Sequence, residues 1–162
     1  MKNILLILLV SLLVYLATSL YFVDKCYFLC PVKYTKGLII RSDSRGDGVF
    51  AAGRSGRRIH KGLDLLAAPD TPVLASRSGR VVAATQNNGM GKYVIIRHSG
   101  NINTLYGHLS RIYVSQGQFL RQGAVIGCVG KTGNANYPDI EPHLHFEVRE
   151  NGISKDPLEY LQ

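Results

Sequence analysis

The first apolar stretch of the chain is continuous. Residues Ile4 to Val23 carry no charged side chain and are mostly Leu, Ile, Val, Ala and Tyr. Twenty residues of α-helix rise about 30 Å, the thickness of a bilayer core. Residues 1–23 are therefore expected to form one transmembrane helix, an uncleaved signal-anchor or a cleaved signal peptide. We favour the anchor, because the apolar run continues past the small residues Ala17-Thr18-Ser19.

Beyond residue 37, apolar and polar positions alternate with a period of two. The clearest case is 143–148, where His, His and Glu alternate with Leu, Phe and Val. Alternation or short apolar runs also predict strands at 72–76, 79–84, 92–98, 104–109, 111–114 and 123–129. Gly and Asn clusters separate these segments. Outside the N-terminus, only a turn near Pro157 to Leu161 is expected to be helical. The pattern predicts an all-β domain, an antiparallel sheet that forms a hybrid of barrel and sandwich.

This reading divides the chain into three parts. Residues 24–36 are expected to be a connector, broken by Pro31, and residues 37–162 a single globular domain. The three cysteines lack the spacing of a zinc knuckle or redox pair. Cys128 lies in an apolar run and is expected to be a buried free thiol, whereas Cys26 and Cys30 are close enough to pair if the chain there is extended.

The net charge of +8 and the isoelectric point near 9.6 suit either a solubilising surface or an anionic partner. An anionic wall polymer and a membrane surface are the candidate anionic partners. Nucleic acid is not expected, because no nucleic-acid-binding motif accompanies the charge.

Candidate chemistry lies in two short clusters about eighty residues apart. The first contains His60 and Asp64, and the second contains His143 and His145. Side chains at i, i+2 and i+4 of a strand lie on one face, so each pair is expected to point one way. Catalytic zinc typically takes three protein ligands of these types and keeps one position open. Four candidate groups thus compete for three ligand positions.

Five blocks carry a resemblance to a known family. In chain order they are His60 to Leu65, Ala68 to Val73, Tyr106 to Ser110, Gly130 to Gly133, and Pro142 to Val148, and the near-terminal Asp156-Pro157-Leu158 also fits. From about Gly37 onward, the chain resembles the lysostaphin-type, LytM-like zinc endopeptidases of peptidoglycan. The resemblance covers about 125 residues.

The resemblance implies a fold, a cofactor and residue roles. It implies a β-sheet groove with one Zn²⁺ per chain, held by His60, Asp64 and His145. His108 and His143 become the two catalytic histidines that do not bind metal. In that role, His143 is expected to take the proton of the attacking water and deliver it to the leaving amine, and His108 to hydrogen-bond the developing oxyanion.

Two segments depart from the family pattern. Residues 42–58 do not match the usual turn before the first ligand, and the loop 134–141 is longer than the common link to the H-x-H strand. Both are expected to line the groove and to affect substrate specificity, while leaving the metal site untouched.

Several further residues have more than one interpretation. His98 is expected to lie at the surface near a turn. Glu147 either orients a ligand or faces solvent, and Tyr106 either lines the groove or packs in the core. The basic residues around His60 either contact anionic groups of a substrate or form a solvated loop; they are Arg54, Arg57, Arg58 and Lys61.

The sequence thus predicts a zinc metalloendopeptidase that hydrolyses peptide cross-links of bacterial peptidoglycan. Its domain is expected outside the cytoplasm, in the periplasm or at the cell surface, tethered to the membrane by the N-terminal helix or secreted after signal cleavage. One alternative is a non-catalytic relative that scaffolds or activates another wall hydrolase, although all five expected site positions are filled. A second is a lipoyl- or biotinyl-type carrier module, which lacks a convincing lysine at a hairpin tip.

Overall fold

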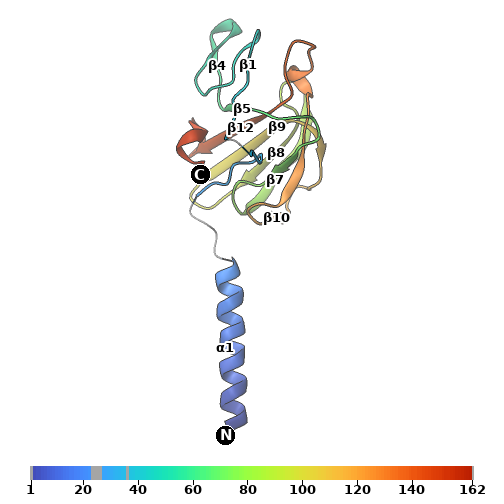
Figure 1. The fold of residues 1–162 in the computed structure, drawn as a ribbon. Helices are drawn as coiled ribbons and strands as arrows, with labels where there is room; N and C mark the ends of the chain where they lie inside the picture. Colours follow the sequence, from blue (N-terminus) through green and yellow to red (C-terminus); the bar gives the residue numbers. More distant parts are fainter. Residues whose placement is uncertain (1, 23–26, 36, 162) are drawn as a thin grey trace.

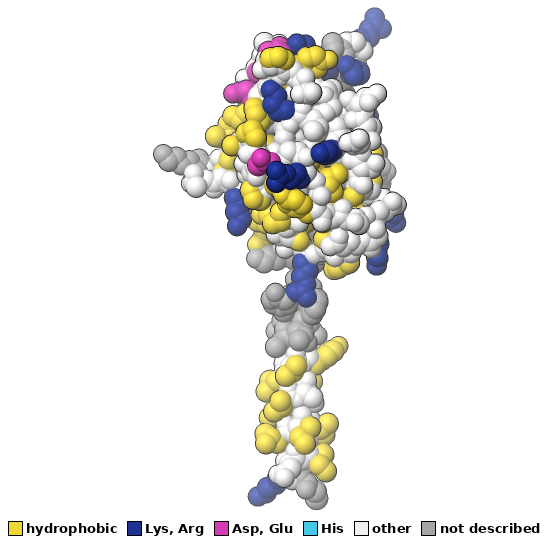
Figure 2. Space-filling view, turned by 90° about the vertical axis from the view of Figure 1, so that its right-hand side faces the viewer, with side chains coloured by type: hydrophobic (Ala, Val, Ile, Leu, Met, Phe, Trp, Pro, Cys, Tyr) yellow, Lys and Arg dark blue, Asp and Glu magenta, His cyan; other side chains and the backbone are white. Residues whose placement is uncertain are grey.

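The computed structural model describes residues 2–22, 27–35 and 37–161. Its first element is the helix α1 (Lys2–Phe22), which Figure 1 shows apart from the β domain. The side chains of residues 2–16 are exposed, and Figure 2 shows apolar groups along the visible face of the helix. The expected helix is therefore present. Among the described residues, however, no helix is both long enough and apolar enough to cross a membrane.

Nine strands form the main sheet, and all their pairings are antiparallel. A path of six runs β10-β7-β8-β9-β11-β6, and β12, β5 and β13 branch from it. The strands are β5 (Leu63–Leu66), β6 (Pro72–Leu74), β7 (Gly79–Asn87), β8 (Gly91–Arg97), β9 (Ile102–Ile112), β10 (Phe119–Leu120), β11 (Val125–Val129), β12 (His143–Glu150) and β13 (Ile153–Lys155). The prediction of a mostly antiparallel β domain is confirmed, and its barrel-like closure stays a prediction.

The sheet forks along its longest strand, β9. The first half of β9 pairs with β12, from Ile102 to Gly107, and its second half pairs with β11, from Leu109 to Ile112. On its other edge, β12 pairs with β5 and β13. The two strands predicted at 104–109 and 111–114 are therefore largely one strand. β5 was not predicted as a strand, because it has only four residues and is buried on both faces.

Two small hairpins stand clear of the main sheet (Figure 1). One is β1 (Ser42–Asp43) with β2 (Gly46–Asp47), and the other is β3 (Gly53–Arg54) with β4 (Arg58–Ile59). The short 3-10 turns are η1 (Ser55–Arg57), η2 (Gly133–Ala135) and η3 (Pro157–Glu159). The last of these is the turn that the sequence predicted near Pro157.

The core fills the apolar face of the sheet. In β12, Leu144, Phe146 and Val148 are fully buried, as the alternation predicted. Residues 27–35, part of the expected connector, also pack here: Phe28 and Val32 are buried in the same cluster. The backbone N–H of Leu29 donates to Ser76 O at 2.8 Å, which joins this segment to the domain.

The structure describes one of the predicted cysteine features and the distribution of basic side chains on one face. Cys128 is a buried free thiol, as expected, whereas Cys26 lies outside the described residues and its pairing stays a prediction. Basic side chains are spread over the face of the domain shown in Figure 2 rather than gathered into one patch. That distribution gives no support to a docking surface for an anionic polymer on this face.

Candidate functional site

The pairing of β5 with β12 sets the first two members of the site. Asp64 lies directly opposite His145 in the ladder, and Phe146 lies opposite Leu63. Facing residues of an antiparallel pair project to the same side of the sheet. The carboxylate and the imidazole are therefore brought together on the polar face, while the two apolar side chains enter the core.

His60 reaches the site from a loop rather than from a strand. It follows β4 and precedes β5, and its backbone exchanges hydrogen bonds with Ala51 and Ala52, each at 2.9 Å. His60 and Asp64 therefore do point to one place, as expected, but from a loop and a strand rather than from the face of one strand. Gly62 makes the close approach feasible, because a Cβ at this position would lie 2.2 Å from Phe146 O.

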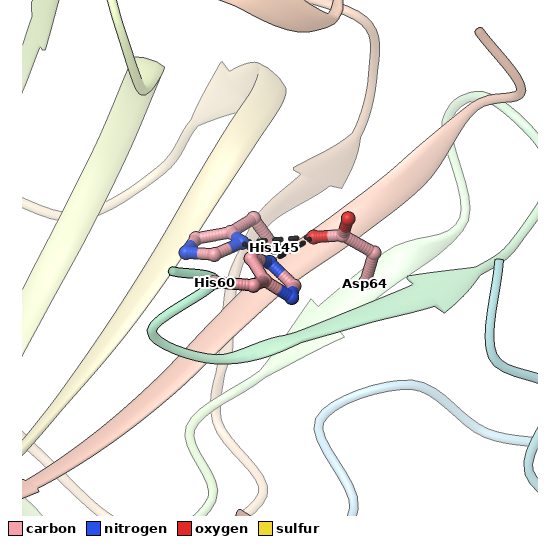
Figure 3. Close-up of side chains that lie close together, drawn as sticks. All are labelled: His60, Asp64 and His145. Carbon is pink, nitrogen blue, oxygen red and sulfur yellow. Dashed lines mark hydrogen bonds and ion pairs between the residues drawn. The ribbon is translucent and has the colours of Figure 1, made fainter. Parts of the chain in front are cut away.

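Three potential ligand atoms converge at this point (Figure 3). His60 Nε2 lies 3.0 Å from Asp64 Oδ1 and 3.0 Å from His145 Nδ1. His145 Nδ1 lies 2.8 Å from Asp64 Oδ1. All three residues are buried. These are the three side chains that the resemblance assigned to zinc.

The outward-facing ring nitrogens determine the tautomers of the two histidines. His60 Nδ1 donates to the carbonyl of Val49 at 2.8 Å, and His145 Nε2 donates to Glu147 Oε1 at 3.0 Å. When both rings are neutral, as metal binding requires, each presents a lone pair, and no N–H, to the other two ligand atoms. Three acceptors 2.8–3.0 Å apart repel one another unless a cation lies among them. The donor set and its outer hydrogen bonds therefore fit a zinc ion.

Two arginines hold the other oxygen of the Asp64 carboxylate. Arg41 Nη2 lies 2.9 Å from Oδ2, and Arg54 Nη2 lies 3.0 Å from the same atom. These contacts leave Oδ1 facing the histidines. Since Arg54 belongs to the divergent stretch 42–58, the expectation that this stretch leaves the metal site untouched is wrong.

The pKa values of these groups reflect the same crowding of acceptors. Burial alone would raise the pKa of the Asp64 carboxyl, but the close approach of His145 and His60 brings it below its ordinary range. Burial alone would lower the pKa of His145, but its hydrogen bonds to Asp64 and Glu147 raise it to about 9. A positive charge at this point, whether a proton or a metal ion, is therefore strongly favoured.

Two further histidines lie beside the cluster. The ring of His108 lies 5.0 Å from that of His143 and 5.8 Å from that of His145. His143 Nδ1 donates to Glu141 O at 2.6 Å, and His108 Nδ1 donates to Thr132 O at 2.9 Å. In both neutral rings, Nε2 is then the free proton acceptor. His143 Nε2 lies 3.9 Å from Asp64 Oδ1.

Burial keeps both of these rings neutral at neutral pH. It lowers the pKa of His143, although the charge of Asp64 opposes that shift. Burial and the neighbouring charges of His145 and His143 lower the pKa of His108 to about 3. The nearby charge of Asp64 favours a proton on His143.

A β-bulge directs His108 into the site. Against β8, the register moves from Val94–Tyr106 to Lys92–Leu109, so Gly107 and His108 together oppose one residue. His108 has a φ of 61°, in the left-handed region. Regular alternation would have placed it on the core face with Tyr106, and the bulge turns it to the face of His145.

The site lies in an open groove of about 710 Å³. Both divergent segments line it, as expected, through residues such as Arg45 and Arg54 from the first and Tyr137 and Ile140 from the second. Of the basic residues around His60, Arg54, Arg58 and Lys61 line this groove.

Three further residues singled out in the sequence, His98, Tyr106 and Glu147, are all buried. His98 is buried, not on the surface: its ring is hydrogen-bonded to Ser78 O at 2.9 Å and to Thr104 Oγ1 at 2.8 Å. Tyr106 is a packed core aromatic and does not line the groove. Glu147 is fully buried and orients His145. Arg41 was missed, because no motif surrounds it and its partner Asp64 is distant in sequence.

The chain thus combines an antiparallel β domain with a groove that contains a candidate metal-binding cluster of two histidines and one aspartate, with two further histidines beside it. The chain belongs to Peptidase family M23, which matches residues 58–157. This confirms the resemblance at the level of the family.

Individual relatives resemble parts of the chain. The DD-carboxypeptidase/endopeptidase Mpg of Neisseria meningitidis serogroup B is 43% identical over 101 residues, which are 62% of this chain and 22% of that protein. The chain thus spans about a fifth of the length of such curated relatives.

Solved structures share the fold. One is described as the SpoIIQ-SpoIIIAH pore forming complex; it is 25% identical, with a TM-score of 0.67, over 85% of this chain and 93% of that one. The antimicrobial peptidase lysostaphin from Staphylococcus simulans is 33% identical, with a TM-score of 0.56, over 62% of this chain and 43% of its own.

Proposed function

We propose that this protein is a zinc metalloendopeptidase that hydrolyses the peptide cross-links of bacterial peptidoglycan. The observation that carries the proposal is the convergence of three lone pairs, on His60 Nε2, Asp64 Oδ1 and His145 Nδ1, within 2.8–3.0 Å of one another. Similarity to a DD-carboxypeptidase/endopeptidase and to lysostaphin supports the choice of substrate.

His60, Asp64 and His145 would hold one zinc ion. Zinc bound there supplies a Lewis acid that polarises a peptide carbonyl and makes water acidic enough to lose a proton near neutral pH. The protein keeps the ligands in place through their outer hydrogen bonds: the carbonyl of Val49 fixes His60, and the buried carboxylate of Glu147 fixes His145.

His143 is proposed as the group that moves protons. Its Nε2 is a free acceptor on the groove side, because Nδ1 is committed to Glu141 O. It takes the proton of the attacking water and, once protonated, delivers it from the same nitrogen to the leaving amine. The nearby charge of Asp64 stabilises the protonated ring between these two steps.

His108 is proposed to hydrogen-bond the oxyanion that develops on the scissile carbonyl. This role requires a proton on Nε2, whereas in the neutral ring the proton is on Nδ1 and bound to Thr132 O. Because a pKa of about 3 disfavours a second proton on this ring, His108 must exchange its tautomer when the substrate enters. A donor aimed at the developing charge typically contributes about 10²–10³ in kcat.

The proposed place of action is outside the cytoplasm, where peptidoglycan lies. The apolar N-terminal segment would serve as a signal-anchor or as a signal peptide for export. N-terminal sequencing of the exported protein distinguishes a retained segment from a cleaved one.

A second candidate function is a non-catalytic scaffold that binds another protein. It is favoured by the similarity to SpoIIQ in a structure described as its complex with SpoIIIAH. A scaffold has no need for the two free histidine acceptors beside the ligand cluster, and this observation favours the enzyme.

Purified full-length protein, loaded with zinc, is incubated with peptidoglycan, and soluble fragments are identified by mass spectrometry. We expect cut cross-links, and no products after zinc is chelated. His145→Ala should lose both metal and activity, while His143→Ala should keep the metal and lose most turnover. Full activity in either variant would refute the assigned roles. A zinc-bound wild type that cuts no peptide would support the scaffold.

A further inference from the structure

The carboxylate of Asp43, in the hairpin β1–β2, is surrounded by hydrogen-bond donors. Its Oδ1 accepts from the backbone N–H of Arg45 at 2.9 Å and pairs with Arg41 Nη1. Its Oδ2 accepts from the backbone N–H of Glu141 at 3.3 Å. Both oxygens are therefore occupied, by groups from two segments about 100 residues apart.

One of these contacts leads to the candidate ligand Asp64. Arg41 is 4% exposed, and it spans the two carboxylates with separate nitrogens, Nη1 on Asp43 and Nη2 on Asp64 at 2.9 Å. The backbone of Arg41 is tied to the same residue, since its N–H donates to Asp64 O at 2.9 Å. Asp43 therefore fixes the guanidinium that holds the outer oxygen of Asp64.

The other contact leads to His143. The peptide group of Glu141 donates its N–H to Asp43, while the carbonyl of the same residue accepts from His143 Nδ1 at 2.6 Å. The orientation of that carbonyl determines which tautomer of His143 is present, and so which nitrogen is the free acceptor. Asp43 contacts both Arg41 and Glu141, which makes it the link between the two sides.

The same hairpin is fastened to the loop 134–141 at a second point. Arg45 and Asp139 form a two-pronged ion pair, with Nε–Oδ2 at 2.6 Å and Nη2–Oδ1 at 3.1 Å. The guanidinium of Arg45 also stacks over the ring of Tyr137, 4.8 Å from its centroid. This clamp is exposed and weak by itself, but it keeps Asp43 within reach of Glu141.

We propose that Asp43 and Arg41 are positioning residues that couple the orientation of Asp64 to that of His143. The relay runs from the Glu141 peptide through Asp43 and Arg41 to the Asp64 carboxylate, so a ligand and the proton-transfer group are set by one path of hydrogen bonds and ion pairs. The catalytic part of this inference rests on the proposed function, whereas the effect on metal binding does not.

The test compares three variants of the full-length protein with the wild type. In Asp43→Asn, either orientation of the amide directs an NH₂ group at a donor, so one side of the relay is lost. Arg41→Lys keeps the charge but lacks the fork that spans two carboxylates. Asp47→Asn is the matched control: it removes the same charge from the same hairpin, where the carboxylate of Asp47 accepts a hydrogen bond from Ser42 Oγ at 2.6 Å.

Two quantities are measured: the zinc dissociation constant, by competition with a chelator, and kcat and KM on a defined cross-linked peptide. Arg41→Lys should weaken zinc binding about tenfold or more. Asp43→Asn should lower kcat about tenfold with little change in KM. The double variant should be scarcely worse than Arg41→Lys alone, because both changes break one path. Asp47→Asn should match the wild type.

The relay would be overturned if the losses of the two single variants multiplied in the double variant. It would also be overturned if both single variants had the zinc affinity and kcat of the wild type. Loss of function through misfolding is recognised by thermal unfolding of the metal-free proteins, and Asp43→Asn, which preserves shape, then carries the test. If the wild type cuts no peptide, the proposed function fails, but the zinc affinities of Arg41→Lys, Asp43→Asn and their double variant still decide whether the path reaches the metal ligands.

Discussion

Gly62→Ala is the substitution whose effect the structure defines most sharply. Gly62 lies between the ligands His60 and Asp64, where the chain passes against β12. A Cβ here would lie 2.2 Å from Phe146 O and 2.9 Å from Glu147 Cγ. The obstacle is mainly backbone, which cannot swing away as a side chain can. The glycine is required for space.

The displacement sets the magnitude. A Cβ contact closer than 3.0 Å is essentially never observed, so the two segments must separate by roughly 0.8 Å. Metal sites tolerate errors of only about 0.2 Å in ligand distances. His60 and Asp64 would move together away from His145, and zinc affinity should fall about 100-fold. Overpacking should also lower the free energy of unfolding by about 2–3 kcal/mol, or roughly 5–10 °C in Tm.

Gly53→Ala is the control, because a Cβ at Gly53 meets nothing within 4 Å. It should leave zinc affinity unchanged and the Tm equal or slightly higher, since Ala reduces the entropy of the unfolded chain. The assays are chelator competition for zinc and thermal unfolding with and without chelator. A Gly62→Ala protein with the zinc affinity and Tm of the wild type would refute the argument that backbone contact at this position holds the ligands together.

Two further predictions concern histidines. His98→Ala should lower the free energy of unfolding by about 2–4 kcal/mol, because the buried hydroxyls of Thr104 and Tyr106 lose the end of their hydrogen-bond chain. The zinc affinity of this variant should equal that of the wild type. A large loss of zinc affinity would show instead that His98 supports the site. Zinc must also displace the proton of His145, whose pKa is raised to about 9 in the metal-free protein, so affinity should rise with pH from 6.5 to about 9 and then level off. Calorimetry in buffers of different ionisation enthalpy should detect about one proton released at neutral pH, and no release there would contradict the raised pKa.

The polar face of β12 shows how far a sequence pattern can determine a site. Alternation over 143–148 was sufficient to separate His143, His145 and Glu147 from Leu144, Phe146 and Val148, because successive side chains of a strand point to opposite faces. The same pattern could not say whether Glu147 faced water. Its burial depends on the neighbouring strands, and those contacts come from the pairing of distant segments.

Arg41 and Asp43 illustrate a different limit. Both lie in a stretch without periodicity, and their partners Asp64 and Glu141 are 23 and 98 residues away along the chain. A charged residue in a loop is ordinarily solvated, so composition gives no reason to place a guanidinium between two carboxylates in a buried site. The divergent stretch 42–58 was read as a specificity loop, yet it supplies Arg54 to Asp64. Such long-range ion pairs follow from the fold and are not encoded in any local pattern.

His108 was identified by a local motif, but its orientation depends on the pairing of distant strands. Its motif identified it, but the rule that assigns faces would have directed it into the core beside Tyr106, because alternation holds only while the ladder is regular. The bulge at Gly107 and His108 breaks the ladder by one residue, and a non-glycine residue with a φ of 61° accepts a strain of about 1–3 kcal/mol. The hydrogen bonds of His108 N to Met90 O and of Nδ1 to Thr132 O hold that conformation. Since the same bulge brings the ring of His108 to 5.0 Å from that of His143 and 5.8 Å from that of His145, the strain is located where the proposed chemistry needs a further histidine.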